Sequence, residues 1–132
     1  MTVDEFMEHV NEAVSESAIE STIATLVHPP GRKPDPEIVR LSQWYLGLSD
    51  VDKAEVKAVV RRGVGFALFG FFCVLDGVRF LEGEGDKGEF ELYFVKGDQR
   101  VRINDPQYEE LHNLYNWYSR DRFKVDDSNP KL

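Results

Sequence analysis

The chain has 132 residues, of which 24 are acidic and 16 are basic, so its formal net charge is −8. This length fits one ordinary domain, and an apolar content of 42% is enough to build a core, which excludes disorder throughout. The single cysteine, Cys73, excludes an internal disulfide and a zinc ribbon. The acidic balance argues against nucleic-acid binding, which requires a basic surface.

The N-terminal segment is predicted to be helical with an interruption at Ser15–Ser17. Thr2 and Glu5 have the spacing of a capping box, which is typical of a helix start. The apolar residues that follow share one helical face and then fall out of phase, and Ser17 and Glu20 repeat the capping-box spacing. We therefore predict either two helices or one kinked helix.

Two further helices are predicted in the middle of the chain. The first covers Glu37–Leu46 and is stopped by Gly47. The second begins near Asp50, runs into an uncharged apolar stretch of 13 residues, 63–75, and ends near Cys73. Because a membrane span needs about 20 apolar residues, we predict a central helix that is buried on nearly all sides, with no membrane attachment. With no basic leader at the N-terminus, the expected location is the cytoplasm.

A three-stranded antiparallel meander is predicted next. Val78–Glu82 is the first strand, Glu89–Val95 alternates as a second, and Gly97-Asp98 suits the hairpin turn to a third. The register pairs Phe94 with Val101 and Leu92 with Ile103 on the inner face, and Val95 with Arg100 and Tyr93 with Arg102 on the outer face.

The chain ends in one more predicted helix, Gln107–Tyr118, preceded by the capping sequence Asn104-Asp105-Pro106. The polar residues 125–132 are expected to fray. The predicted order of elements is N-terminal helices, meander and C-terminal helix. This order indicates a single α+β domain over residues 1–124.

Charge is unevenly distributed, because six acids and no Lys or Arg occur in the first 20 residues. Four glutamates at every fourth position form one stripe on a straight helix: Glu8, Glu12, Glu16 and Glu20. Like charges at this spacing destabilise a helix slightly. The stripe can be a solvated face, can bind a basic partner, or can be neutralised within the chain. A basic row of the same spacing lies in the central helix: Lys53, Lys57 and Arg61.

Other residues are weaker candidates for a site. The remaining candidates for partner contact are Glu5, Trp117, Tyr93 and Arg102. Glu109 and His112 form one Glu-x-x-His motif, whereas a carboxylate-bridged di-iron site needs two. Cys73 has apolar neighbours, which favours a core cysteine over a nucleophile.

The pattern favours a small acidic protein-binding module, such as an inhibitor, an immunity-type neutraliser or a regulatory adaptor, that occludes a basic partner surface. No cofactor motif or catalytic combination of residues is recognisable in the sequence, so no cofactor is expected. The alternative is a protein that binds a small ligand or a metal, with enzymatic activity open, at a site between sheet and helices that uses His112, Glu109 and Tyr93. A homodimer formed through the outer sheet face or the last helix is a further hypothesis.

Overall fold

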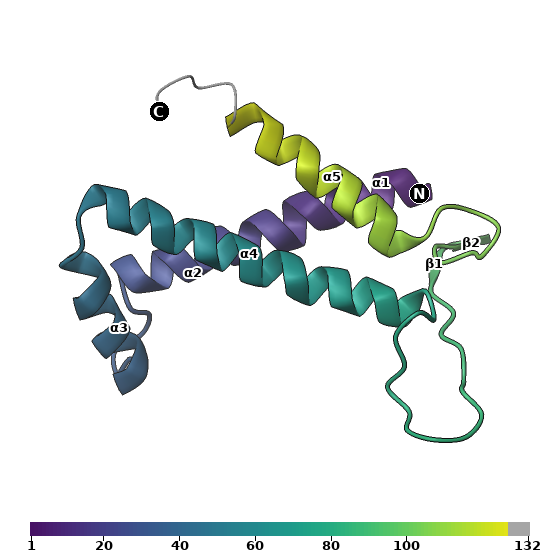
Figure 1. Cartoon of the computed structure of the whole chain (residues 1–132), viewed down its shortest axis with the longest axis horizontal. Helices are drawn as coiled ribbons and strands as arrows, with labels where there is room; N and C mark the ends of the chain where they lie inside the picture. The colour runs from purple at the N-terminus through teal and green to yellow at the C-terminus, as the bar shows by residue number, and fades with distance from the viewer. Residues whose placement is uncertain (127–132) are drawn as a thin grey trace. The chain divides into compact units, whose positions relative to one another are not determined.

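The computed structural model describes residues 1–126 (Figure 1). Side chains are described as far as Arg120. Of the tail predicted over 125–132, residues 127–132 lie outside this description. The described chain is α+β, with helices and a two-stranded antiparallel sheet. Its contacts group into two units. The first unit contains residues 1–12 and the described residues from 66 onward, and the second unit contains residues 13–65.

The N-terminal helix begins as predicted but is interrupted in a different way. In α1 (Val3–Val10) the Glu5 N–H donates to Thr2 Oγ1 at 3.1 Å, and the Thr2 N–H donates to Glu5 Oε2 at 2.8 Å. A π-helix, η1 (Asn11–Glu16), leads directly into α2 (Ser17–Val27). The wider turn of a π-helix shifts the helical phase without ending the helix.

The second capping box, at Ser17 and Glu20, is therefore wrong. Glu16 precedes α2 in right-handed helical conformation and makes no capping side-chain bond. Because the turn before α2 is already helical, the first N–H groups of α2 do not need a capping side chain. The shift in phase of the apolar residues near Ser15 is therefore explained by the π-helix and not by a new helix start.

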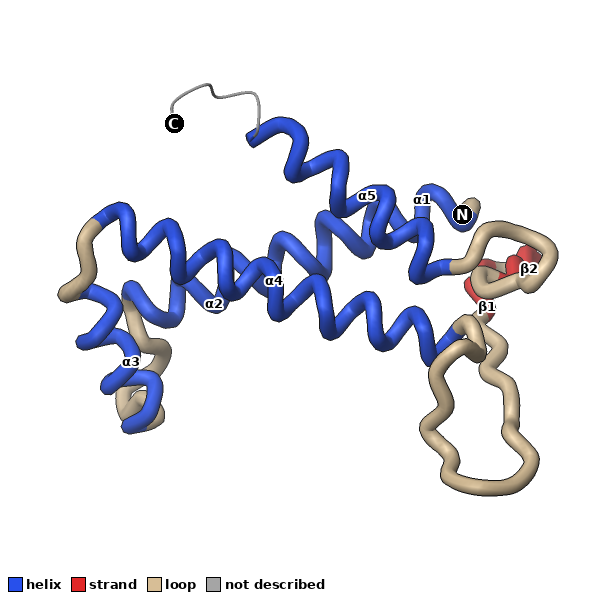
Figure 2. The backbone as a smooth tube through the Cα atoms, viewed as in Figure 1, coloured by secondary structure: helices blue, strands red, loops and turns tan. Residues whose placement is uncertain are grey.

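The second unit contains α2, α3 (Pro36–Leu46) and the first part of α4 (Asp50–Leu75). Asp35 caps α3 by accepting the Glu37 N–H at 2.8 Å, and Gly47 follows its end as predicted. Helices α2 and α3 pack against each other (Figure 2). The buried apolar residues of this unit are Ile19, Leu26 and Tyr45.

Helix α4 ends close to the predicted position, but the prediction that it is buried on nearly all sides is wrong. Its buried residues are Gly70, Phe72, Cys73 and Val74. Phe66 is 72% exposed, and over residues 50–65 no α4 side chain is fully buried. The row that includes Val56, Val60 and Val64 is half-buried. The uncharged stretch 63–75 thus contains fully buried residues only from Gly70 onward, in the last turns of the helix.

By length and composition, α4 is the single candidate membrane span among the described residues. The most apolar 18-residue segment of this helix has a mean hydropathy of 1.8, and 22% of the segment is buried inside the protein. Core helices of soluble proteins pass the same criterion, so this property by itself assigns no environment.

The predicted three-stranded meander is wrong, because Val78–Glu82 is not a strand and the sheet has only two described strands. These are β1 (Tyr93–Lys96) and β2 (Gln99–Arg102). Residues 76–92 form a long loop instead (Figure 2). Local bonds close this loop, since the Gly88 N–H donates to Glu82 Oε2 at 2.8 Å and Lys87 Nζ donates to the Glu82 carbonyl at 3.3 Å.

The hairpin itself is confirmed in its register. The structure pairs Tyr93 with Arg102, Phe94 with Val101, Val95 with Arg100 and Lys96 with Gln99. The Ile103 N–H also donates to the Leu92 carbonyl at 2.8 Å. The turn requires a positive φ of 57° at Gly97, a conformation that glycine adopts without strain.

The inner face of the hairpin joins the core of the first unit. This core consists of Met7, Phe72, Ile103, Leu111 and Tyr115. The Phe72 and Tyr115 ring centroids lie 5.4 Å apart, and Phe6 meets Phe72 edge-on at 6.4 Å. Helix α1, the end of α4, the hairpin and the last helix thus share one apolar centre.

The last helix, α5 (Leu111–Asp126), begins later than predicted and continues past Tyr118. Asp105 forms a separate turn, because its Oδ1 accepts the Gln107 N–H at 2.9 Å and its carbonyl accepts the Tyr108 N–H at 3.1 Å. The predicted capping sequence therefore caps this turn. The helix takes its cap from elsewhere in the chain.

Candidate functional site

The structure separates the four glutamates of the predicted stripe. Glu8 and Glu12 belong to the first unit, whereas Glu16 and Glu20 belong to the second. Glu8, Glu12 and Glu20 are exposed, and no ion pair to them is found in the described part of the chain.

Glu16 is neutralised within its own unit, as one of the sequence hypotheses allowed. Its Oε1 lies 2.8 Å from Arg61 Nη1, and both side chains are largely shielded. Lys53 lies over the Tyr45 ring at 5.6 Å. A wholly uncompensated stripe is therefore contradicted at Glu16.

Glu5 supports the start of α1. The Thr2 N–H donates to its carboxylate, and this backbone hydrogen bond lowers the pKa of Glu5 below its usual value. A carboxylate held in a capping box has less freedom to contact a partner.

An acidic–aromatic face, formed by Asp4, Glu8, Trp117 and Tyr118, lies where α1 packs against α5 (Figure 1). Tyr118 Oη donates to Asp4 Oδ1 at 3.3 Å. Trp117 meets Tyr118 edge-on at 5.0 Å between ring centroids and is 59% exposed. On this face one tyrosine, Tyr118, contacts both the Asp4 carboxylate and the exposed Trp117 ring.

The electrostatics of this face are visible at Tyr118. Partial burial raises the pKa of Tyr118, and the charges of Asp4 and Glu8 raise it further because they disfavour the phenolate. The structure thus groups Glu8 and Trp117, which the sequence indicated, with Asp4 and Tyr118, which were not named as site residues. Only the packing of two distant helices brings them together.

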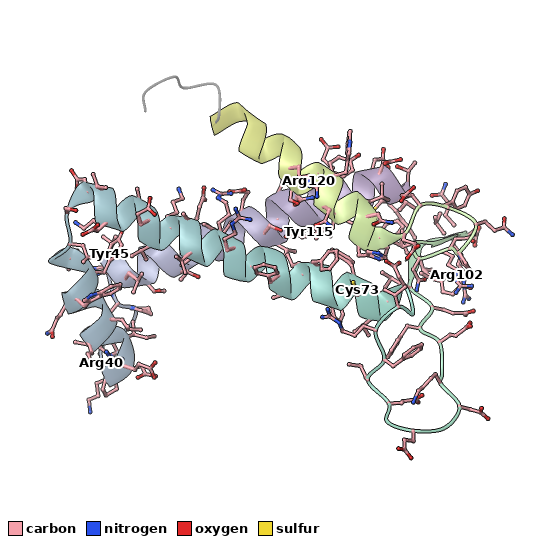
Figure 3. The ribbon with its side chains drawn as sticks, viewed as in Figure 1. Arg40, Tyr45, Cys73, Arg102, Tyr115 and Arg120 are labelled. Atoms are coloured by element: carbon pink, nitrogen blue, oxygen red, sulfur yellow. The ribbon has the colours of Figure 1, made fainter. Side chains whose placement is uncertain are left out.

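Tyr93 and Arg102, the other predicted contact residues, lie on the hairpin and interact with side chains in it or just before it. Figure 3 labels Arg102. The Arg100 guanidinium stacks 4.1 Å from the centre of the Tyr93 ring. Arg102 Nη1 lies 3.3 Å from Glu91 Oε1, and Tyr93 Oη donates to Glu91 Oε2 at 3.4 Å. Among the described side chains, no hydrogen bond, ion pair or ring contact is found that joins Tyr93 or Arg102 to the acidic–aromatic face.

Asp76, in the turn after α4, caps the distant helix α5. Its Oδ1 accepts the Leu111 N–H at 3.0 Å, and its Oδ2 accepts the His112 N–H at 2.9 Å. His112 Nδ1 lies 2.7 Å from the same Oδ2. This distance is that of a hydrogen bond between the imidazole ring and the carboxylate. Glu110 approaches the same nitrogen at 3.5 Å.

Glu109 and His112, which the sequence left only as weak candidates for metal ligands, do not lie in the same helix. Glu109 is exposed and precedes the first residue of α5, so the two side chains do not share a helical face. Asp76, Glu110 and His112 instead offer potential ligand atoms within 4.8 Å of one another. A cation bound through His112 Nδ1 would have to displace the bond to Asp76, so this arrangement favours helix capping.

An open cleft of about 490 Å³ adjoins this cluster in the first unit. Both charged and aromatic side chains line it, including Lys87, Arg102, Glu110, Phe80, Phe90 and Tyr108. Its volume and mixed lining fit a small polar ligand. Cys73 is buried, and burial raises the pKa of its thiol, which fits the predicted core role.

The chain matches no family model, no curated protein and no solved structure.

The sequence analysis did not identify Asp76 as the residue that caps α5. The Asp76-Gly77 turn was its local signal, but the partners of Asp76 lie 35 and 36 residues further along the chain.

Proposed function

We propose that this protein is an acidic protein-binding module that uses the acidic–aromatic face to occlude a basic surface of a partner protein. The observation that supports this function is the position of Trp117, which is 59% exposed and contacts the Tyr118 ring. The Tyr118 hydroxyl donates to Asp4, and the charges of Asp4 and Glu8 act on it. Aromatic side chains dominate binding energy in protein interfaces, and peripheral charges accelerate association. An inhibitor, an immunity-type neutraliser or a regulatory adaptor would act in this way.

The two parts of the face have different roles. Glu8 lacks an ion-pair partner among the described residues, so it is available to attract a cationic partner. Glu12 is equally exposed at the start of η1 and adds to the same field. Trp117 presents an apolar surface that becomes dehydrated on contact. We expect electrostatic steering by the acids and most of the affinity from the tryptophan.

Synthetic peptides that alternate lysine or arginine with apolar residues are suitable probes, titrated at low and high salt by calorimetry. Glu8→Gln with Glu12→Gln should weaken binding about 1.4- to fivefold per charge, because exposed ion pairs contribute about 0.2–1 kcal/mol. Trp117→Ala should weaken it about tenfold. Glu20→Gln is the matched control, since it removes the same charge from an exposed acid of the second unit.

Equal weakening by Glu20→Gln would show that only the net charge matters, and this result would contradict the proposal.

A second candidate function is the binding of a small ligand in the cleft, which is favoured by the volume and the mixed lining of the cleft. In that case no basic peptide would bind, and a metabolite or a divalent metal would raise the Tm in a thermal-shift screen. Glu8→Gln would leave that rise unchanged.

A further inference from the structure

The long loop of the first unit encloses one side chain, and that side chain is a lysine. Over residues 77–91, Lys87 is half-buried and every other residue is exposed. The Lys87 ammonium lies 6.0 Å from the centre of the Phe80 ring, and it donates to the Glu82 carbonyl at 3.3 Å. Lysine is normally among the most exposed residues of a protein. The loop is therefore shaped around an ammonium group.

The Phe80 ring borders two adjoining hollows of the first unit. The cleft of about 490 Å³ and a second hollow of about 180 Å³ share Phe80, Phe90 and Glu89 in their linings. Phe80 is 55% exposed, Phe90 is 49% exposed, and Tyr108 in the cleft is 67% exposed. Aromatic faces attract organic ammonium ions through the negative charge of the ring face. The cleft thus offers open aromatic surface beside a carboxylate.

The charged residues of the cleft favour a cation over an anion. Four acids and two bases line it: Asp76, Glu89, Asp105, Glu110, Lys87 and Arg102. Of the two bases, Arg102 is paired with Glu91 at 3.3 Å. Glu89 is exposed, and no ion pair to it is found among the described residues. An incoming cation therefore meets a surplus of negative charge.

One atom of the cleft lining favours an anion instead. Arg102 Nε is buried and has no hydrogen-bond partner among the described residues. Such a donor favours an additional acceptor. Because protein atoms enclose Nε, a ligand in the open cleft does not reach it without displacing them. An anion of the same shape is the necessary comparison for any cation.

We propose that the cleft binds a primary ammonium ion carried on an apolar group, and that this ammonium replaces Lys87 beside Phe80 and Glu89. The inference rests on the second candidate function, ligand binding in the cleft, and names the ligand class. The Lys87 ammonium is held weakly, because 6.0 Å is the outer limit of a cation–π contact and its hydrogen bond is long. The apolar group of the ligand contacts Phe90 and Tyr108.

NMR titration of the full chain with n-butylammonium chloride tests this proposal, because n-butylammonium reproduces a lysine side chain from Cβ onward. Sodium pentanoate, which carries a carboxylate on the same four-carbon chain, is titrated at equal ionic strength. We expect saturable binding of n-butylammonium and no binding of pentanoate. The Lys87 ε-methylene protons should also lose the ring-current shift that Phe80 imposes on them, because Lys87 leaves the ring.

Two variants with matched controls locate the site. Phe80→Ala should weaken n-butylammonium binding about two- to thirtyfold. Phe71→Ala, which removes a 57% exposed ring of the same unit outside the cleft, should not weaken it. Lys87→Gln should strengthen binding about two- to tenfold, because the competing ammonium is removed. Lys96→Gln removes the same charge from an exposed position of the hairpin and should leave binding unchanged.

Absence of saturable n-butylammonium binding would overturn the proposal. So would binding that leaves the Lys87 protons unshifted, or equal weakening by Phe80→Ala and Phe71→Ala. Binding of pentanoate in preference would overturn the ammonium class and retain the cleft as a ligand site. Trp117→Ala should not change n-butylammonium binding, so this result is independent of the acidic–aromatic face.

The ammonium group can belong to a free amine or to a lysine side chain of a protein. N-acetyl-lysine methylamide separates these two sources, because it carries the same side chain on a peptide backbone. Binding equal to that of n-butylammonium would support a lysine of a partner protein. Binding of n-butylammonium alone would support a free amine.

Discussion

Tyr118 shows how a single side chain reports on the surface around it. Its hydroxyl donates to Asp4, its ring contacts Trp117, and the charge of Glu8 also acts on it. Partial burial and these carboxylates all favour the neutral phenol, so the pKa of Tyr118 lies above its usual value. The ionisation of one residue therefore measures whether α1 and α5 form the acidic–aromatic face.

We predict that Glu8→Gln lowers the pKa of Tyr118, because a nearby negative charge is removed. NMR titration of the tyrosine ring carbons measures this shift, with Glu20→Gln as a control that leaves it unchanged. The folded pKa exceeds the unfolded value of about 10. Stability linked to Tyr118 is thus complete below pH 10 or so and declines as the pH rises through the folded pKa. A pKa unaffected by Glu8→Gln would contradict the described face.

At the scale of elements, two polar side chains connect segments that are far apart in the chain. Asp76 caps α5 from the turn after α4. Asn104 is buried, and its Nδ2 donates to the Leu75 carbonyl at 2.7 Å and to the Phe90 carbonyl at 2.8 Å. Its Oδ1 accepts the Leu92 N–H at 2.8 Å. These bonds hold the long loop without the strand that the sequence predicted.

We expect Asp76→Ala to lower the free energy of unfolding by about 1–3 kcal/mol, because the cap of α5 is lost and the buried donors of Leu111 and His112 lose their acceptor. Urea denaturation followed by circular dichroism measures this change. Glu109→Ala, at an exposed neighbouring position, should change stability by less than about 0.5 kcal/mol. Similar values for the two variants would argue against a distant cap.

For the whole molecule, the main structural fact is that apolar residues are buried in two groups. One is the core of the first unit, which includes Leu111 and Tyr115. The other lies in the second unit and includes Ile19 and Tyr45. Each group brings together segments that are distant in sequence. The burial of a side chain therefore depends on the tertiary contacts within its unit.

We predict that Leu111→Ala lowers the free energy of unfolding by about 2–5 kcal/mol, because Leu111 is fully buried and its truncation leaves a cavity. Hydrogen exchange monitored by mass spectrometry should show faster exchange in the first unit, while α2 and α3 keep their protection. Uniformly faster exchange in both units would instead indicate a single cooperative core.

Sequence patterns predicted the elements whose signals are local. Thr2 and Glu5 begin α1, Gly47 follows α3, and the hairpin register around Gly97 is confirmed, because each depends on residues only a few positions apart. The strand predicted at Val78–Glu82 is wrong, because a short strand-like run does not by itself provide a pairing partner.

For the site, the chain itself revealed an acidic N-terminal segment and an aromatic last helix. It could not show that Glu16 pairs with Arg61, that Tyr118 meets Asp4, or that Asp76 caps α5. Each of these contacts joins residues more than 30 positions apart. Helix and turn signals arise from nearby backbone groups, whereas burial and ion pairing depend on which distant surfaces meet, and only the folded chain decides this.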